Sequence, residues 1–134
     1  MLVAAAGPVS NVLMATALFI ALMAMKLFSP ESAAVLRRVA AHEFFGDSCL
    51  VPLMAVAYQG IVINLVLAVF NLIPVAPLDG AAVLSGLLPR PLANALDQLQ
   101  SYGFIILLGL LYLGIPSMLY SPVINLVLSY LIAF

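Results

Sequence analysis

Two long apolar runs limit what this chain can fold into. Residues 3–27 and 50–72 each hold the roughly 20 mainly apolar residues that an α-helix needs to cross the hydrocarbon core of a bilayer. The chain of 134 residues is 66% hydrophobic and 7% charged, whereas a soluble domain is only about half apolar. We therefore predict an integral membrane protein whose first partner is the lipid bilayer.

The predicted fold is all-α, a polytopic transmembrane helical bundle that forms a single domain over residues 1–134. The predicted spans are residues 3–27, 50–72, 78–88 (short), 100–115 and 122–134. Prolines bound a break at 116–122, which leaves a last helix too short to cross a membrane upright. The polar segment 30–48 is predicted to be a loop that holds a short interfacial helix.

The charged residues exclude one class of partner. The formal net charge is −1, and the cationic residues are scattered along the chain: Lys26, Arg37, Arg38 and Arg90. This distribution gives no footprint for nucleic acid. The first apolar run is longer than the core of a signal peptide and contains Pro8 and Asn11, so it is interpreted as a membrane span. Because this run follows Met1 at once, we expect Met1 to be an internal methionine of a longer protein.

The segment from Asn71 to Gly80, N-L-I-P-V-A-P-L-D-G, interrupts the apolar pattern. Pro74 and Pro77 lack amide donors and disfavour helical angles in the residues before them, which predicts an extended break between two helices. Broken backbone at membrane depth is tolerated only where protein buries it or water reaches it. We thus predict a broken, proline-rich intramembrane loop.

Asp79, next to the end of this segment, is the residue that most needs an explanation. An ionised carboxylate near the bilayer interior costs at least about 2.5 kcal/mol unless another group compensates it. A bound cation is the strongest compensation. Alternatively, Asp79 caps the helix that follows by accepting hydrogen bonds from backbone amides at a wet membrane edge. The residues alone leave both interpretations open.

The segment resembles the N-x-x-P-x-P-x-L-D-G signature of the site-2 proteases, a family of intramembrane zinc metalloproteases, and the resemblance is to the prokaryotic type. Residues 6–11, A-G-P-V-S-N, resemble the G-P-x-x-N element of the same family, and residues 102–104 agree more weakly. The resemblance implies that Asp79 is the third zinc ligand, beside two histidines of an H-E-x-x-H helix. It also implies an integral protein of the prokaryotic inner membrane that cleaves a transmembrane helix of another protein.

The resemblance further implies a substrate-binding role for four residues: Asn71, Pro74, Pro77 and Asn11. The amide of Asn71 can donate and accept at once, so it would hold an extended substrate strand or steady a developing oxyanion. Alternatively, it satisfies the broken backbone after Phe70. For Asn11 the alternative is a hydrogen bond to a neighbouring helix.

The chain departs from the family pattern in two ways. Ala76 stands where the family usually has its second proline, and no H-E-x-x-H occurs in the sequence. The single His-Glu pair starts at His42, with Gly46 in place of the second histidine. Because His42 lies in the polar loop, we interpret it as a solvated or interfacial histidine and not as a ligand. The chain is therefore predicted to hold no catalytic residue and to be inactive alone.

Two functions remain open at this point. The first is the C-terminal portion of a site-2-type zinc metalloendopeptidase, which carries the third ligand and the substrate-side loop and depends on an upstream H-E-x-x-H helix. The second is a non-catalytic membrane scaffold or regulator related to these proteases. A channel or transporter has less support, because three or four spans with one acidic residue give little to build a pathway. A second copy of the chain, in a homo-oligomer, is a further candidate partner.

Overall fold

The computed structural model describes residues 2–44 and 48–133, and this part of the chain is helical without any strand. The helices are α1 (Leu2–Phe28), α2 (Pro30–Ala40), α3 (Leu50–Asn71), α4 (Asp79–Leu87), α5 (Arg90–Gln100), α6 (Gly103–Tyr112) and α7 (Ile115–Ala133). Among the described residues, three helices are long and apolar enough to cross a membrane, namely α1, α3 and α7. The prediction of an all-α fold with membrane-spanning helices is confirmed.

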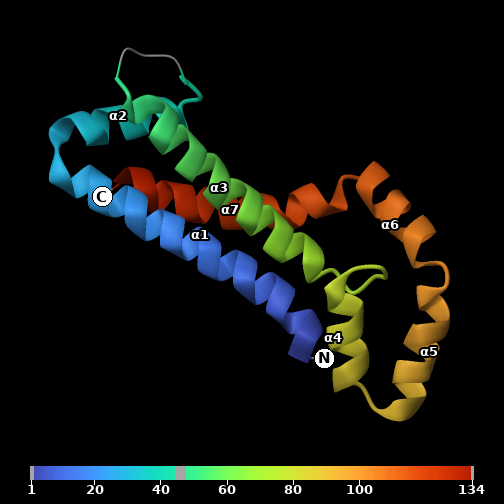
Figure 1. Cartoon of the computed structure of the whole chain (residues 1–134). Coiled ribbons are helices and arrows are strands. Elements are labelled where there is room, and N and C mark those ends of the chain that lie inside the picture. The colour runs from blue at the N-terminus through green and yellow to red at the C-terminus, as the bar shows by residue number, and fades with distance from the viewer. Residues whose placement is uncertain (1, 45–47, 134) are drawn as a thin grey trace.

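The long helices α1 and α3 run antiparallel and side by side, and α2 lies across one end of the pair (Figure 1). A Cβ on Gly60 of α3 would lie 2.6 Å from Cδ1 of Leu18, so the glycine lets the two helices approach closely. The polar segment after α1 contains the expected short helix. Ser29 caps it by accepting a hydrogen bond from the Ser32 amide at 3.1 Å, and Pro30 takes the first helical position.

The hydrophobic core lies where α1, α2, α3 and α7 meet. Its largest fully buried side chains are Leu22, Leu36, Met54, Ile61, Leu131, Val39 and Val51. Lys26 of α1 is also buried there, and its Nζ donates to the carbonyl oxygens of Leu131 at 2.8 Å and Ile132 at 3.3 Å. A helix C-terminus has carbonyls without helical partners and favours a cation. Lys26 therefore fastens the end of α7 to α1.

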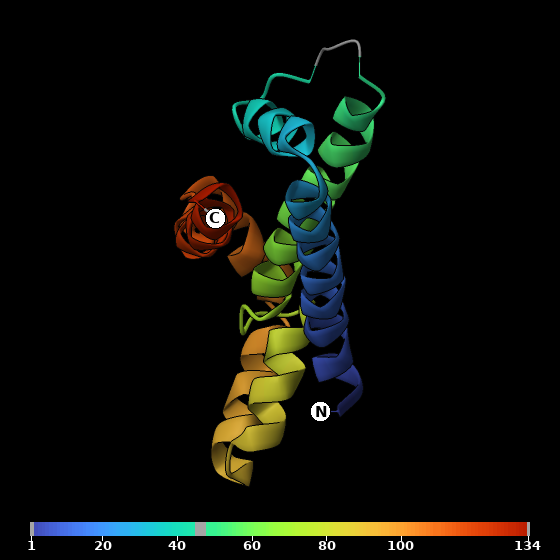
Figure 2. The same cartoon turned by 90° about the vertical axis from the view of Figure 1, so that its left-hand side faces the viewer.

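The shorter helices form an arm at the other end of the bundle. After α3 the chain turns through residues 72–78 into α4, returns along α5, and reaches α7 through α6 (Figure 1). Figure 2 shows α4 and α5 side by side below the α1–α3 pair. Oγ of Ser85 in α4 donates to Oδ1 of Asp97 in α5 at 3.0 Å, which joins the two helices.

The C-terminal third differs from the prediction. The last helix begins at Ile115 rather than at 122, so its 19 residues suffice to cross a membrane and the predicted break at 116–122 is wrong. Pro116 occupies the first turn, where a missing amide costs little, and Pro122 inside the helix removes one hydrogen bond without ending it. The span predicted at 100–115 is the shorter α6, which bends by 72° from α5.

Candidate metal and substrate site

The loop between α3 and α4 packs closely against its neighbours at two positions where only glycine fits. Helix α3 ends at Asn71 and α4 begins at Asp79, so the two polar residues flank the loop. A Cβ on Gly80 would lie 2.6 Å from the carbonyl oxygen of Ile73, because the loop folds back onto the first turn of α4. Any larger residue at position 80 would push the loop away from the helix that Asp79 starts.

The start of α6 holds the loop from its other side. A Cβ on Gly103 would lie 2.9 Å from the Cβ of Ala76 and would also collide with the backbone of Ala76. Gly103 belongs to the weakly matching tail of the sequence, and the structure gives it a physical role as a close-approach point. Pro74 and Pro77 between these contacts are exposed. The loop thus keeps its prolines on the surface and its backbone against α4 and α6.

Asp79 lies beside the first turns of α1. A Cβ on Gly7 would be 2.6 Å from Oδ2 of Asp79, so the carboxylate occupies the space that a side chain at position 7 would need. Gly7 is the glycine of the A-G-P-V-S-N element, and Asp79 closes the proline-rich segment. The structure therefore brings the two sequence elements together. This contact was not predicted, although the glycine of the first element was the signal that could have indicated it.

The carboxylate of Asp79 is half-buried and makes no hydrogen bond or ion pair with the described residues. Helix α4 has no side-chain cap, so the capping role considered for Asp79 is not observed. Asp97 provides a contrast, because its Oδ1 accepts hydrogen bonds from Ser85 at 3.0 Å and from Nε2 of Gln100 at 3.2 Å. Asp79 is thus a carboxylate in the first turn of α4 whose two oxygens accept no hydrogen bond from the described residues.

Asn71 and Asn11 are placed relative to Gly7 by the helices that carry them. Since Gly60 packs against Leu18, the antiparallel course of α1 and α3 places Asn71 about level with Gly7. Asn11 follows Gly7 by one turn on the same face of α1. Both asparagines are half-buried, and neither side chain is hydrogen-bonded to a described residue.

The backbone after α3 is satisfied without the help of Asn71. The amide of Leu72 donates to the carbonyl of Val69 at 3.2 Å, and the amide of Ile73 donates to the carbonyl of Phe70 at 3.1 Å. The structural role considered for Asn71 is therefore not observed. Its carboxamide can therefore donate and accept hydrogen bonds at the position where the loop begins.

The described residues alone do not build a complete metal site. They contain no group of three or more His, Cys, Asp and Glu side chains close enough to hold an ion. His42 is exposed and stacks on Phe44 with ring centroids 5.9 Å apart. It follows α2, at the end of the bundle away from α4 (Figure 1). Gly46 lies outside the described residues. Asp79 therefore belongs to no group of three candidate ligands among residues 2–44 and 48–133.

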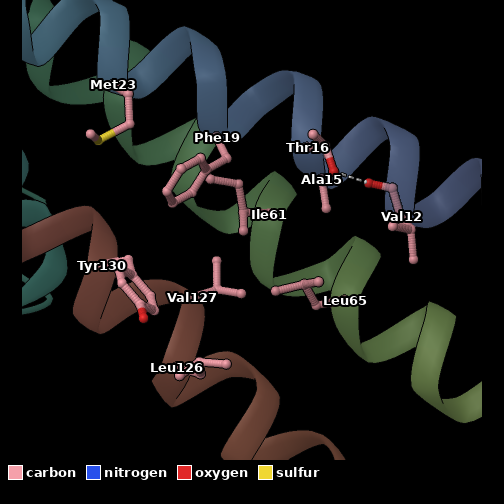
Figure 3. A pocket seen from close by; sticks show the side chains of 10 residues that line it. All are labelled: Val12, Ala15, Thr16, Phe19, Met23, Ile61, Leu65, Leu126, Val127 and Tyr130. Carbon is pink, nitrogen blue, oxygen red and sulfur yellow. Dashed lines mark hydrogen bonds between the residues drawn. The ribbon is translucent and has the colours of Figure 1, made fainter.

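A pocket of about 440 Å³ lies between part of α7 and the α1–α3 pair, and its walls are apolar (Figure 3). Within it, Oγ1 of Thr16 donates to the carbonyl of Val12 at 2.8 Å, so this hydroxyl is already satisfied. The lining contains no His, Cys, Asp, Glu, Lys or Arg side chain. The groups that could do chemistry lie at the loop and not in this cavity.

Comparison with known proteins supports a metalloprotease relationship. The chain is 34% identical over 124 residues to a Bacillus subtilis (strain 168) protein named "Putative zinc metalloprotease YwhC". The alignment covers 92% of this chain and 51% of that protein, so the chain spans about half the length of the curated relative it matches. No family model and no solved structure matches the chain.

Proposed function

We propose that this chain is part of a site-2-type intramembrane zinc endopeptidase, in which Asp79 supplies one zinc ligand and the loop after Asn71 faces the substrate. The observation that carries the proposal is the contact between Gly7 and Asp79, which joins the two family-like sequence elements at one place. The similarity to a protein named as a zinc metalloprotease supports it. The proposed location is the inner membrane of a prokaryotic cell.

The residues of the chain fit one part of such a metal site. Catalytic zinc is commonly held by three protein ligands, for example two histidines and a carboxylate. Asp79 offers a half-buried carboxylate that no described residue engages. The one histidine of the sequence, His42, follows α2 at the far end of the bundle. We infer that both imidazoles come from polypeptide outside this sequence, in keeping with the half-length match to the relative.

When bound, zinc would activate water and polarise the peptide carbonyl. The task of this chain's own residues is positioning. Gly7 leaves room for the Asp79 carboxylate. Because Asp79 is the first residue of α4, the start of this helix would orient the carboxylate toward the metal. The carboxamide of Asn71 would hold the extended backbone of an unwound substrate helix by donating and accepting together. Pro74 and Pro77 are exposed beside it and bring no competing amide donor. Asn11 of α1 would contact the same stretch of substrate.

The test uses the longer reading frame that contains this sequence and its native upstream region. Bound zinc and cleavage of a transmembrane model substrate are measured for that protein, for Asp79→Asn, and for Asp97→Asn as the matched control. We expect Asp79→Asn to lose zinc and cleavage by more than the roughly 10- to 100-fold typical of losing an outer-shell partner, and Asp97→Asn to keep both. Zinc and cleavage that survive Asp79→Asn would overturn the role of Asp79.

The second candidate function is a non-catalytic scaffold or regulator related to these proteases. It is favoured by one observation, that no three-ligand group exists among residues 2–44 and 48–133. The same experiment separates the two functions. If the longer protein binds no zinc and cleaves no substrate, while Asp79→Asn leaves its folding unchanged, the scaffold function replaces the protease function.

A further inference from the structure

The proline-rich loop engages nearly all of its own backbone donors. Within residues 72–78, Pro74 and Pro77 have no amide hydrogen to donate. Four amides donate to carbonyls at the end of α3 or within the loop, at 2.8 to 3.2 Å: Leu72, Ile73, Val75 and Leu78. Ala76 is the exception, because its half-buried amide donates to no described residue. Since backbone amides away from bulk water are usually paired, this donor is the one that the loop can offer to a ligand.

Ala76 is held in place by the start of α6. A Cβ on Gly103 would lie 2.9 Å from the Cβ of Ala76 and 3.0 Å from its carbonyl carbon, and it would also collide with the carbonyl oxygen. A pocket of only about 20 Å³ remains between the loop and the α5–α6 junction, little more than one water molecule needs. The carbonyl side of Ala76 therefore packs against α6, and its nitrogen is not among the three atoms closest to Gly103.

The two close contacts of the loop hold different parts of it. Gly80 of α4, next to Asp79, packs against the backbone where the loop begins. Gly103 of α6 packs against Ala76, further along the loop. Because the second contact acts on Ala76 and not on the helix that carries the acid, a change at Gly103 should move the Ala76 amide and leave the Asp79 carboxylate in place.

We propose that the Ala76 amide donates a hydrogen bond to a backbone carbonyl of the substrate, and that Gly103 is a positioning residue that sets where this donor lies. An unwound segment of a substrate helix has carbonyls that have lost their helical partners. Main-chain hydrogen bonds supply affinity for extended peptides, while side-chain pockets supply specificity. The donor therefore accepts any substrate residue at this point. This inference rests on the proposed protease function.

The positioning role is tested in the longer reading frame with Gly103→Ala and, as the matched control, Gly109→Ala. Both glycines lie in α6, and a Cβ on Gly109 meets nothing within 4 Å. We expect Gly103→Ala to raise KM for the transmembrane model substrate about three- to tenfold, the range of one neutral hydrogen bond, with bound zinc and kcat kept. A merely structural role would instead lower zinc and kcat at unchanged KM, because less folded protein would remain.

The donor itself is tested by replacing Ala76 with lactic acid through nonsense suppression, which exchanges the amide N–H for an ester oxygen and keeps the side chain. Alanine inserted at the same codon is the control. We expect the ester to raise KM about three- to tenfold with zinc and kcat kept. Adding Gly103→Ala to the ester should raise KM little further, because both changes remove the same hydrogen bond.

Three results would overturn the inference and leave the proposed function intact. They are equal KM values for Gly103→Ala and Gly109→Ala, an unchanged KM for the ester at Ala76, and fully additive effects in the double variant. An unchanged KM for the ester would mean that water alone binds this amide. A longer protein that binds no zinc and cleaves no substrate would overturn the proposed function, and this inference with it.

Discussion

The two ends of the bundle are built on different principles. At the α2 end, large side chains such as Leu22, Leu36 and Met54 are fully buried, and the one buried cation, Lys26, makes two hydrogen bonds among the described residues. At the loop end, α5 has no buried residue, and the closest contacts involve glycines. There Asp79 and Asn71 lack hydrogen-bond partners in the described structure.

This difference assigns stability mainly to the α2 end of the bundle and the candidate binding groups to the loop end. A polar group that is fully satisfied by its own chain stabilises a fold, whereas one left unsatisfied is available to a ligand. The α2 end satisfies its polar groups and packs densely, so it holds the helices together. The loop end keeps a carboxylate and a carboxamide without hydrogen-bond partners among the described residues, and it is the end for which we propose ligand binding. Substitutions at the two ends should therefore change different measured quantities.

The largest expected effect is on activity at the loop end. In the longer reading frame, Gly7→Leu should lower cleavage at least about 100-fold, because its side chain displaces the Asp79 carboxylate and a shift of about 1 Å can cost that much. Cleavage of the model substrate is the measurement. Gly109→Leu is the control, since a Cβ on Gly109 meets nothing within 4 Å. Full activity of Gly7→Leu would show that the contact has no functional role.

The second effect is on stability at the α2 end. Leu22→Ala should lower the free energy of unfolding by about 2–3 kcal/mol, the low end of the range for buried leucines. The reduction is moderate because lipid is as apolar as the core, so mainly packing is lost. Leu108→Ala on the exposed face of α6 is the control and should change little. Equal losses in both variants would erase the difference between the two ends. Unfolding in mixed micelles gives the free energies.

The sequence predicted much of this architecture from local signals. The long apolar runs became α1 and α3, and the proline-rich segment separates α3 from α4, with Asp79 as the first residue of α4. The prediction failed where a local rule was overridden. Pro116 and Pro122 were read as a break, yet one lies in the first turn of α7 and the other costs a single hydrogen bond inside it.

Contacts between distant residues could not be predicted from local signals. Lys26 and Leu131 are separated by 105 positions, and no pattern in either segment indicates their hydrogen bond. The contact of Gly7 with Asp79 likewise depends on how α1 and α4 pack. The roles of Asp79, Asn71, Asn11, Pro74 and Pro77 in metal or substrate binding remain predictions, because they depend on ligands that other polypeptide would provide.

The third effect tests the buried cation. Lys26→Met keeps the apolar part of the side chain and removes the charge, so it should lower the free energy of unfolding by about 1.5–2 kcal/mol through loss of the charged hydrogen bonds to α7. Arg37→Met, on the exposed face of α2, should change it by less than about 0.5 kcal/mol. If Lys26→Met is as stable as the parent protein, the α2 end owes its stability to apolar packing alone.

The smallest effect is expected where the loop-end arm is held by an exposed hydrogen bond. Ser85→Ala removes the donor to Asp97, and because water can replace it, the free energy of unfolding should fall by only about 0.5 kcal/mol. Ser117→Ala is the control, since that hydroxyl donates within its own turn and joins no helices. A loss above about 2 kcal/mol for Ser85→Ala would mean that α4 and α5 are held as firmly as the core. The same Asp97 carboxylate would then be a structural anion, and the contrast with Asp79 would become one between a stabilising and a ligand-binding acid on adjacent helices.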